Sequence, residues 1–473
     1  MSSPIRTTSS TAGRRLHSAW RALLALLAVA VLAAAALASQ ADRIRAGAEA
    51  YLYGYPLLIM DLTRRQAAAS GIPENQLRRV RQFPDARFKG VVRPNVDTLY
   101  TTAFIDMAQG PWVFEMAPND QRYEVMPFMD AWTNVFAAPG TRLSGTGGGR
   151  FLLVGPGWQG ELPAGMQLLR SPTRSVWLIG RTQTNGAADY PLVHRLQDGL
   201  RLRPLNPSTA AAPMTPMAPA AAAGPARAEP SRPPVQQLQA LSTEACFSRL
   251  AALMVDNPPS AADGPMLTRL SHLGIAPGQP LRWGLLDRWG LGLGRWAADF
   301  QVARELKQPR RLVRGWSTPP ANLGQYGTDY ATRAAVAMVG LGANLPADAS
   351  YPNAQVDDQG AALNGSHRYR LHFPAGGLPP VKAFWSVTAY GADDHLIDNP
   401  LQRHALGDRD PLVFNADGSL DLWLQADAPP AERQANWLPV QAGAAFLLNA
   451  RLYWPQEAAL NGAWAMPAVE RLD

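Results

Sequence analysis

Apolar positions follow two different patterns in the first half of the chain. From residue 41 to 66 they recur every three or four residues, which predicts an amphipathic helix; Gly54 and Pro56 predict a kink or a break in it. Between residues 88 and 202 they form short runs separated by Gly, Pro and Asn. Runs of this length and spacing predict an antiparallel β-sandwich or barrel.

Helical spacing returns between residues 243 and 342. Ser260 and Asp263 form the pattern of a capping box at the start of one helix, and Thr328 is expected to cap a later helix. The rest of the chain again has short apolar runs between turn residues, which predicts a second β-sandwich. Its expected strands are 369–373, 384–390, 420–424 and 445–453.

The N-terminus has the pattern of an export signal. Arginines precede an uninterrupted apolar run over residues 22–38, which ends in Ala36-Leu37-Ala38 before Ser39. A basic start, an apolar centre and small residues at the end are typical of a cleaved secretory signal peptide. We therefore expect a periplasmic or secreted protein. An uncleaved membrane anchor is the alternative, although the run is at the short limit for crossing a bilayer.

Between the first β region and the helical region, Ala, Pro, Met and Ser dominate. Such a segment cannot bury an apolar face, and its prolines favour an extended, solvated chain. The sequence therefore divides into five parts. They are a signal peptide (1–38), a helix with a β-sandwich (39–203), a Pro/Ala-rich linker or insertion (204–236), an α-helical domain (237–345) and a C-terminal β-sandwich (346–473).

Composition and charge argue against two classes of protein. With 47% hydrophobic and 17% charged residues, the 473-residue chain can form folded cores, so it is not a disordered protein. The formal charge is +7, and four leader arginines supply four of these charges, so the remainder carries 7 − 4 = +3. Without a dense basic run after the leader, we expect no nucleic-acid partner. Cys246 is the only cysteine, so no intrachain disulfide can form.

Short motifs in both β regions resemble those of a known family. The N-terminal motifs include Asn95-Val96-Asp97-Thr98-Leu99-Tyr100, Asp130-Ala131-Trp132-Thr133-Asn134, Gly155-Pro156-Gly157-Trp158 and Leu178-Ile179-Gly180-Arg181. The C-terminal motifs include Leu363-Asn364-Gly365, Phe384-Trp385-Ser386-Val387-Thr388, Asn436-Trp437-Leu438-Pro439 and Arg451-Leu452-Tyr453. In these motifs the chain resembles a family of exported, mainly bacterial proteins. Its members combine domain of unknown function 1254 with domain of unknown function 1214.

The resemblance implies an architecture but no reaction. It implies a multidomain, mainly β protein with an N-terminal immunoglobulin-like sandwich, a central α-helical domain and a C-terminal jelly-roll-like β-sandwich. The family has no agreed activity and no catalytic set. Candidate chemistry must therefore come from the residues of this chain.

Two of the N-terminal motifs place polar side chains in the same way. In an extended strand alternate side chains share a face, so Asn95 and Asp97 point one way, as do Asp130, Trp132 and Asn134. If both strands belong to one sheet, their polar faces can meet. Asp97 and Asp130 would then form a carboxylate pair in which one acid stays protonated and acts as a general acid or base.

Neighbouring side chains are candidates for ligand binding. Arg93 would orient an anionic group, and Tyr100 or Trp132 would supply a stacking wall. The full set of ligand-binding candidates is Arg93, Asn95, Tyr100, Trp132 and Asn134. A structural interpretation competes with this one, because Asp and Asn beside strand ends commonly fix loop backbone and Arg93 can simply pair with a carboxylate.

The histidines do not follow a metal-binding pattern. His367, His372, His395 and His404 all lie in the C-terminal region, but His367 and His372 would face opposite sides of a continuous strand. The sequence has no His-Glu-x-x-His or Cys-x-x-Cys motif. We therefore predict no metal and no cofactor.

Together these patterns favour a ligand-binding protein. We predict an exported envelope protein that binds a small or oligomeric ligand in a cleft between its sandwiches, with acid-base turnover of the hydrolase or lyase type as an extension. The alternative is a non-catalytic β-sandwich module that assembles with itself or with a partner. A membrane contact is expected only through an uncleaved leader. A deep pocket at Asp97 or Asp130 favours the first hypothesis, and a broad apolar patch the second.

Overall fold

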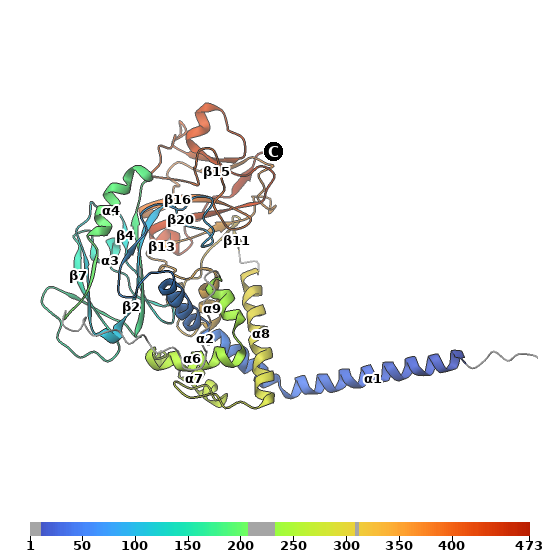
Figure 1. Cartoon of the computed structure of the whole chain (residues 1–473). Helices are drawn as coiled ribbons and strands as arrows, with labels where there is room; N and C mark the ends of the chain where they lie inside the picture. The colour runs from blue at the N-terminus through green and yellow to red at the C-terminus, as the bar shows by residue number, and fades with distance from the viewer. Residues whose placement is uncertain (1–10, 207–231, 308–311) are drawn as a thin grey trace, which may run out of the picture.

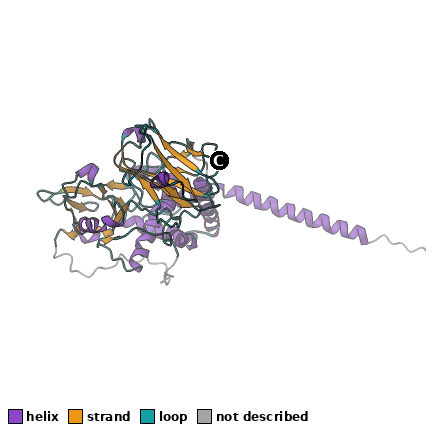
Figure 2. Cartoon of the chain, turned by 90° about the horizontal axis from the view of Figure 1, so that it is seen from above, coloured by secondary structure: helices purple, strands orange, loops and turns teal. Residues whose placement is uncertain are grey.

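The computed structural model describes residues 11–206, 232–307 and 312–473. Most of the expected insertion (204–236) and the first ten residues of the leader lie outside the described residues. The chain is a multidomain protein, mainly β with helical parts, as predicted (Figure 1). Seen from above in Figure 2, the strands gather in two groups with helices beside them, and one helix extends away from the body.

Two sheets form the N-terminal β region. Their strands are β1 (Arg78–Arg79), β2 (Thr98–Asp106), β3 (Trp112–Met116), β4 (Glu124–Val125), β5 (Phe128–Asp130), β6 (Val135–Ala137), β7 (Gly149–Val154), β8 (Gln167–Arg170), β9 (Ser175–Gln183) and β10 (Arg201–Pro204). One sheet has the order β1-β2-β9-β5-β6, with β4 also on β9, and the other has the order β10-β3-β7-β8. Alternation in β2 sends Ile105 into a core with Phe114 of the second sheet, and Phe104 to the opposite face.

Two further sheets form the C-terminal β region. Their strands are β11 (Leu312–Val313), β12 (Trp316–Ser317), β13 (Ala349–Ser350), β14 (Asn353–Ala354), β15 (Tyr369–Phe373), β16 (Val381–Gly391), β17 (Ala405–Gly407), β18 (Leu420–Gln425), β19 (Trp437–Pro439), β20 (Phe446–Pro455) and β21 (Val469–Arg471). Their orders are β11-β12-β14-β20-β16-β17, with β13 on β20, and β19-β18-β15-β21. The expected strands are therefore present, and two short ones, β11 and β12, come from the predicted helical region.

The helices surround one long helix. They are α2 (Ala41–Ala69), α5 (Pro234–Ala240), α6 (Thr243–Asp256), α7 (Gly264–His272), α8 (Leu285–Lys307) and α9 (Tyr330–Val339). Tyr51, Tyr53 and Leu58 of α2 lie fully buried in their common core. The N-terminal helix therefore packs with the helices that follow the β-sandwich. The shorter α3 (Thr141–Ser144), α4 (Tyr190–Asp198) and α10 (Glu457–Leu460) lie at loops of the β regions.

Local signals in these helices were predicted with mixed success. The expected capping box of Ser260 and Asp263 is present. The expected break at Pro56 is wrong, because α2 runs through it, and the surrounding helices outweigh the one hydrogen bond that proline removes. The cap of α9 lies one residue later than predicted, where the Asp329 side chain accepts from the Thr332 amide at 3.1 Å.

The segment predicted to be the leader contains a separate helix, α1 (Thr11–Ser39), which projects from the body (Figure 1). It meets the body at Gln40, which is buried and starts α2. Among the residues that the structure describes, no helix has the combination of length and apolarity needed to cross a membrane.

The two β regions meet through aromatic side chains. Tyr123 of the N-terminal region packs against Phe384 of β16 and Tyr453 of β20, and the last two rings stack with centroids 4.1 Å apart. Phe104 and Ile179, from the outer face of the first sheet, belong to the same buried cluster. This contact fixes the two β regions relative to each other.

Candidate functional site

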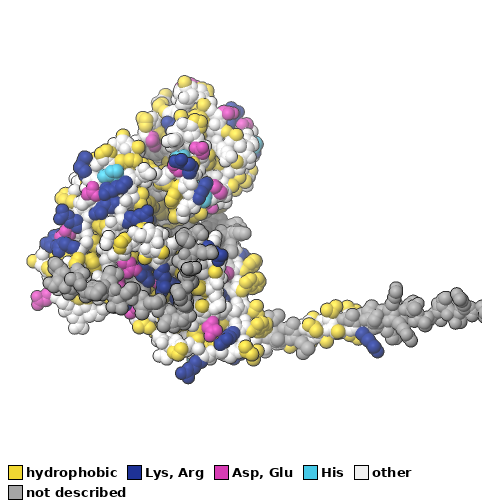
Figure 3. All heavy atoms as spheres, in the orientation of Figure 1, with side chains coloured by type: hydrophobic (Ala, Val, Ile, Leu, Met, Phe, Trp, Pro, Cys, Tyr) yellow, Lys and Arg dark blue, Asp and Glu magenta, His cyan; other side chains and the backbone are white. Residues whose placement is uncertain are grey.

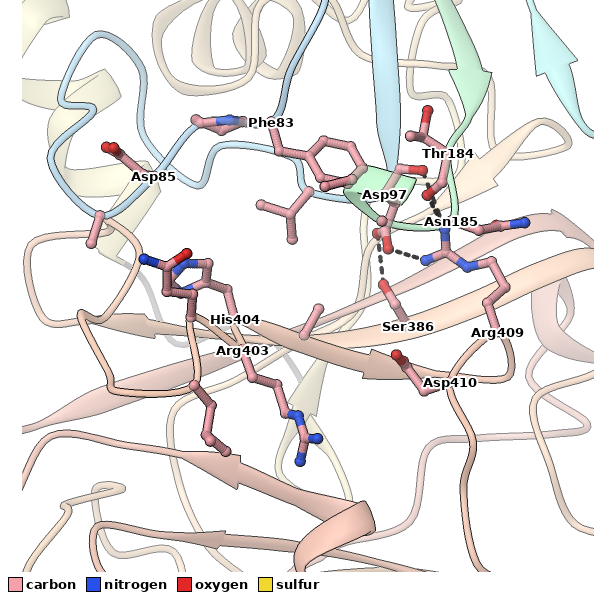
Figure 4. A pocket seen from close by; sticks show the side chains of 18 of the residues that line it. Phe83, Asp85, Asp97, Thr184, Asn185, Ser386, Arg403, His404, Arg409 and Asp410 are labelled. Carbon is pink, nitrogen blue, oxygen red and sulfur yellow. Dashed lines mark hydrogen bonds and ion pairs between the residues drawn. The ribbon is translucent and has the colours of Figure 1, made fainter. Parts of the chain in front are cut away.

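A cleft of about 790 Å³ lies where the two β regions meet (Figure 4). Both regions line it. The N-terminal region contributes Phe83, Asp85, Arg87, Asp97, Asn185 and Tyr190, and the C-terminal region contributes Ser386, Asp398, Gln402, Arg403, His404, Arg409 and Asp410, among others. The volume lies within the range of small-molecule sites, about 300–1,000 Å³.

Asp97 lies at the floor of this cleft. It directly precedes β2, and Asn95 fixes its backbone because the Asn95 Oδ1 atom accepts from the amides of Asp97 (2.7 Å) and Thr98 (3.0 Å). One carboxylate oxygen accepts a hydrogen bond from the Ser386 hydroxyl at 2.7 Å, and the other pairs with Arg409. The Tyr453 hydroxyl donates to Asp97 as well, at 3.4 Å. Asp97 is fully buried, so these three partners replace the water that its charge has lost.

Arg409 ties the two β regions together at this point. It lies just after β17, and its Nη1 atom donates to the backbone oxygens of Asp97 (3.2 Å) and Thr184 (3.0 Å), while Nη2 donates to the Asp97 carboxylate. The guanidinium lies over the Phe384 ring, 4.1 Å from its centroid. Its buried Nε–H has no hydrogen-bond partner among the described residues. The charge of Arg409 is therefore paired within the protein and is not available to a ligand.

The other basic side chains of the cleft are engaged as well. Arg403 donates to the backbone oxygens of Gln434 and Trp437, and the exposed Arg87 pairs with Asp85 at 2.6 Å. Asp398, by contrast, is exposed and has no ion pair within the described part of the chain. The cleft is lined by four acidic and three basic side chains, so its net charge is 3 − 4 = −1.

His404 contributes a neutral ring. Its Nδ1 atom lies 3.1 Å from the backbone oxygen of Ile397, which can only accept, so Nδ1 carries the proton and Nε2 is an acceptor. Burial lowers the pKa of the imidazole below its usual value, so the ring stays uncharged at neutral pH. Within the described ranges no group of three His, Cys, Asp or Glu side chains is placed to hold a metal ion.

The predicted pairing of Asp97 with Asp130 is wrong. Both lie beside β9, but the Asp97 backbone oxygen accepts from Thr184, whereas Asp130 pairs with Val176. Val176 lies in β9 and Thr184 directly follows its end, so the two partners are 184 − 176 = 8 positions apart, which is about 26 Å at about 3.3 Å per residue. Asp130 does not line the cleft.

Asp130 instead fixes a turn. Its carboxylate accepts from the Asn134 amide at 2.8 Å and from the Asn134 side chain at 3.1 Å, which closes the connection from β5 to β6. Burial raises the pKa of Asp130 to about 6. Trp132 packs against the Tyr53 ring of α2 and donates to the Asn257 backbone oxygen. Asp130 and Trp132 therefore have structural roles, as the alternative to the catalytic hypothesis predicted.

The remaining candidates also contact protein and do not line the cleft. Arg93 pairs with Asp394 at 2.7 Å and donates to Asn353, so it is not free to orient an anionic group. The Nδ2 atom of Asn95 donates to the Tyr453 hydroxyl at 2.9 Å, and the Tyr100 ring lies beneath Arg181. Of the predicted residues, the cleft receives Asp97 alone.

Sequence reasoning missed the C-terminal half of the site. Ser386 lies in one of the motifs that carried the family resemblance, which was the one signal that pointed to it. Arg409 and His404 lie in no motif that predicts a partner for Asp97. Ser386 and Arg409 are 289 and 312 residues from Asp97 along the chain, so local patterns could not connect them.

Comparison with protein families assigns the two halves of the site to two different domains. The model described as "Protein of unknown function (DUF1254)" matches residues 74–204, and the model "Protein of unknown function (DUF1214)" matches residues 348–457. The chain belongs to the family that combines these two domains. In this DUF1254–DUF1214 protein, the first domain contributes Asp97 and Asn185 to the cleft and the second contributes Ser386 and Arg409.

One solved structure supports the fold of the DUF1254–DUF1214 chain. The chain is similar to the crystal structure of the VPA0106 protein from Vibrio parahaemolyticus, with 23% identity, a TM-score of 0.71, and coverage of 91% of this chain and all of that one. An uncharacterised protein from Burkholderia cenocepacia matches at 12% identity and a TM-score of 0.45 over 94% of this chain and 99% of that one. A comparison with curated protein sequences found no match.

Proposed function

We propose that this protein is exported to the periplasm or secreted and binds a small polar ligand in the cleft between its DUF1254 and DUF1214 domains. The observation that carries this proposal is the cleft itself, about 790 Å³ in volume, with Asp97 and Ser386 from opposite domains in contact at its floor. The immunoglobulin-like and jelly-roll-like descriptions of the two sandwiches belong to the same proposal.

The charges of the cleft favour a ligand with hydroxyl or ammonium groups. Arg409 and Arg403 donate to oxygens of the protein, and the Arg409 Nε–H that has no partner among the described residues is buried, whereas Asp398 and the rim amide Gln402 are exposed. Phe83 and Tyr190, with ring centroids 5.7 Å apart, supply an apolar wall. Such a lining fits a polyol, sugar or amine better than a carboxylate or phosphate.

We propose binding in preference to turnover. Acid-base catalysis by two carboxylates needs both acids at the reacting atoms, and Asp130 lies about 26 Å away along β9. Asp97 is itself held by Arg409 and Ser386, which suits a residue that shapes the floor of the cleft. Because the Ser386 hydroxyl donates its proton to Asp97, its oxygen is left to accept a hydrogen bond from the ligand.

A thermal-shift screen tests this function. Polyols, sugars, amines and carboxylates are added to the wild-type protein, and a ligand at 100 times its Kd stabilises the folded state by about 2.7 kcal/mol. The change Asp398→Asn removes the free charge of the rim and is expected to weaken an amine ligand at least tenfold. Asp427→Asn, an exposed carboxylate outside the cleft, is the matched control and is expected to leave the shift unchanged. Stabilisation by anions alone, or equal shifts in both variants, would contradict the proposal.

A further inference from the structure

Helix α8 exposes a stripe of large apolar side chains. Leu285, Trp289, Trp296 and Phe300 are 85%, 42%, 69% and 65% exposed. At about 100° per residue their spacings of four, seven and four place them within about 60° of one another around the helix. We call these four residues the outer face of α8. Figure 3 shows hydrophobic side chains along this edge of the body.

The outer face is not needed to pack the helix. Leu291, Ala298 and Val302 lie on the other side of α8 and are buried in the core around α2. The Trp296 and Phe300 rings stack on each other, with centroids 6.3 Å apart, and otherwise project into solvent. An exposed apolar stripe of this kind marks an interaction surface.

The outer face lies beside the root of the leader helix α1. Gln40, where α1 meets α2, is buried against α8: a Cβ added at Gly290 would lie 3.1 Å from the Gln40 Oε1 atom. Arg43 pairs with Asp287 of α8 at 2.8 Å. In Figure 1 α1 leaves the body at the foot of α8 and extends on the side where hydrophobic side chains line α8 in Figure 3.

Helix α1 presents an apolar surface of its own. Leu24, Leu26, Val29 and Val31 are between 58% and 68% exposed. A helix of this composition enters lipid when the chain is exported. Because Gln40 at the root of α1 is buried against α8, the N-terminal half of α8 lies near the same lipid surface for as long as the leader is attached.

We propose that the outer face of α8 binds an anionic lipid surface, so that the protein has a membrane contact besides its leader. Trp and Phe on one face with arginines at the margins are typical of helices that lie in the headgroup region. Arg282 and Arg304 are exposed near the stripe, and so is Arg288, which pairs with Glu244 at 3.4 Å. A second copy fits less well, because a two-fold pairing of α8 about Trp296 brings Arg288 near Arg304, and like charges repel.

This inference rests on the proposed export but not on the ligand cleft. Ligand binding in the cleft is measured without vesicles, and lipid binding by the outer face is measured without ligand. Either proposal can therefore fail while the other holds.

Fluorescence quenching in vesicles tests the lipid contact on the full chain. Phe300→Cys is labelled with an environment-sensitive dye, and Val413→Cys, 54% exposed in the C-terminal β region, is the matched control. Cys246 is buried, so it does not take the label. With phosphatidylglycerol vesicles that carry a lipid-attached quencher, we expect at least a threefold loss of intensity at position 300 and little change at position 413.

Two controls separate the outer face from the leader and from self-association. Tethering by the leader alone would leave the quenching at position 300 unchanged when Trp296→Ser is added, whereas an inserted face loses at least half of it. Circular dichroism melts check that these exposed changes leave the fold intact. Three results would overturn the proposal. The label at position 300 could stay in water, its quenching could be insensitive to Trp296→Ser, or its spectral shift could grow with protein concentration in the absence of vesicles.

Discussion

Asp97 and Asp130 border the same sheet, in motifs of similar composition, yet they have different partners. Both are buried. Asp97 receives a guanidinium from the other β region, at the floor of a cleft, whereas Asp130 receives amides from its own turn and has no ion pair within the described residues. The role of each carboxylate therefore depends on the side chains that the fold places beside it, and not on its local sequence motif.

The largest effect is expected from removing the partner of Asp97. Arg409→Met leaves the Asp97 charge buried and unpaired, so the free energy of unfolding at pH 7 should fall by about 3–5 kcal/mol. Urea denaturation measures this change. Arg87→Met, at an exposed ion pair of the same cleft, is the control and should have no measurable effect. A loss below about 1 kcal/mol at Arg409 would show that the ion pair does not hold the cleft floor.

A pH-dependent effect is expected at Asp130. Its pKa of about 6 in the folded protein exceeds the usual 3.8, so the stability that its protonated form contributes is complete below pH 4 and is lost as the pH rises through 6. Two pKa units correspond to about 3 kcal/mol.

Comparison of wild type with Asp130→Asn isolates this contribution. Other acids titrate alike in both proteins, so the wild type should lose about 2 kcal/mol relative to the variant between pH 4.5 and 7.5, because about 1.5 of the two pKa units fall in this range. Urea denaturation at several pH values gives the difference. Parallel curves would mean that Asp130 does not titrate in this range and that its burial has little electrostatic cost.

A smaller effect is expected at the other partner of Asp97. Ser386→Ala removes the hydroxyl that donates to the carboxylate at 2.7 Å and should lower the free energy of unfolding by about 1–2 kcal/mol. It should also weaken any ligand bound in the cleft. Ser271→Ala, whose hydroxyl donates to Thr268 on the exposed side of α7, should change stability by less than about 0.5 kcal/mol and leave ligand binding intact.

Sequence patterns predicted the helices and strands better than the contacts between them. The periodicity of α2 and the alternation of β2 follow from local burial. Asp97 lines the cleft between the β regions, and its role there stays a prediction. The separation of Asp97 from Asp130 depends on where β2 and β5 join β9, which no local pattern encodes. Arg409 reaches Asp97 through tertiary packing alone, so the sequence could not name it.

The smallest effect is expected at an ion pair that links the same two β regions on the surface. Lys89 and Asp393 are 2.9 Å apart, but their side chains are 53% and 60% exposed. Water already satisfies both charges, so Lys89→Ala should lower the free energy of unfolding by less than about 0.5 kcal/mol, as urea denaturation would show. A loss as large as that of Arg409→Met would mean that the number of links between the regions controls stability. Both ion pairs join the same two β regions. A small loss for Lys89→Ala beside a large loss for Arg409→Met would therefore mean that burial of the Asp97 charge, and not the number of links, determines the loss of stability.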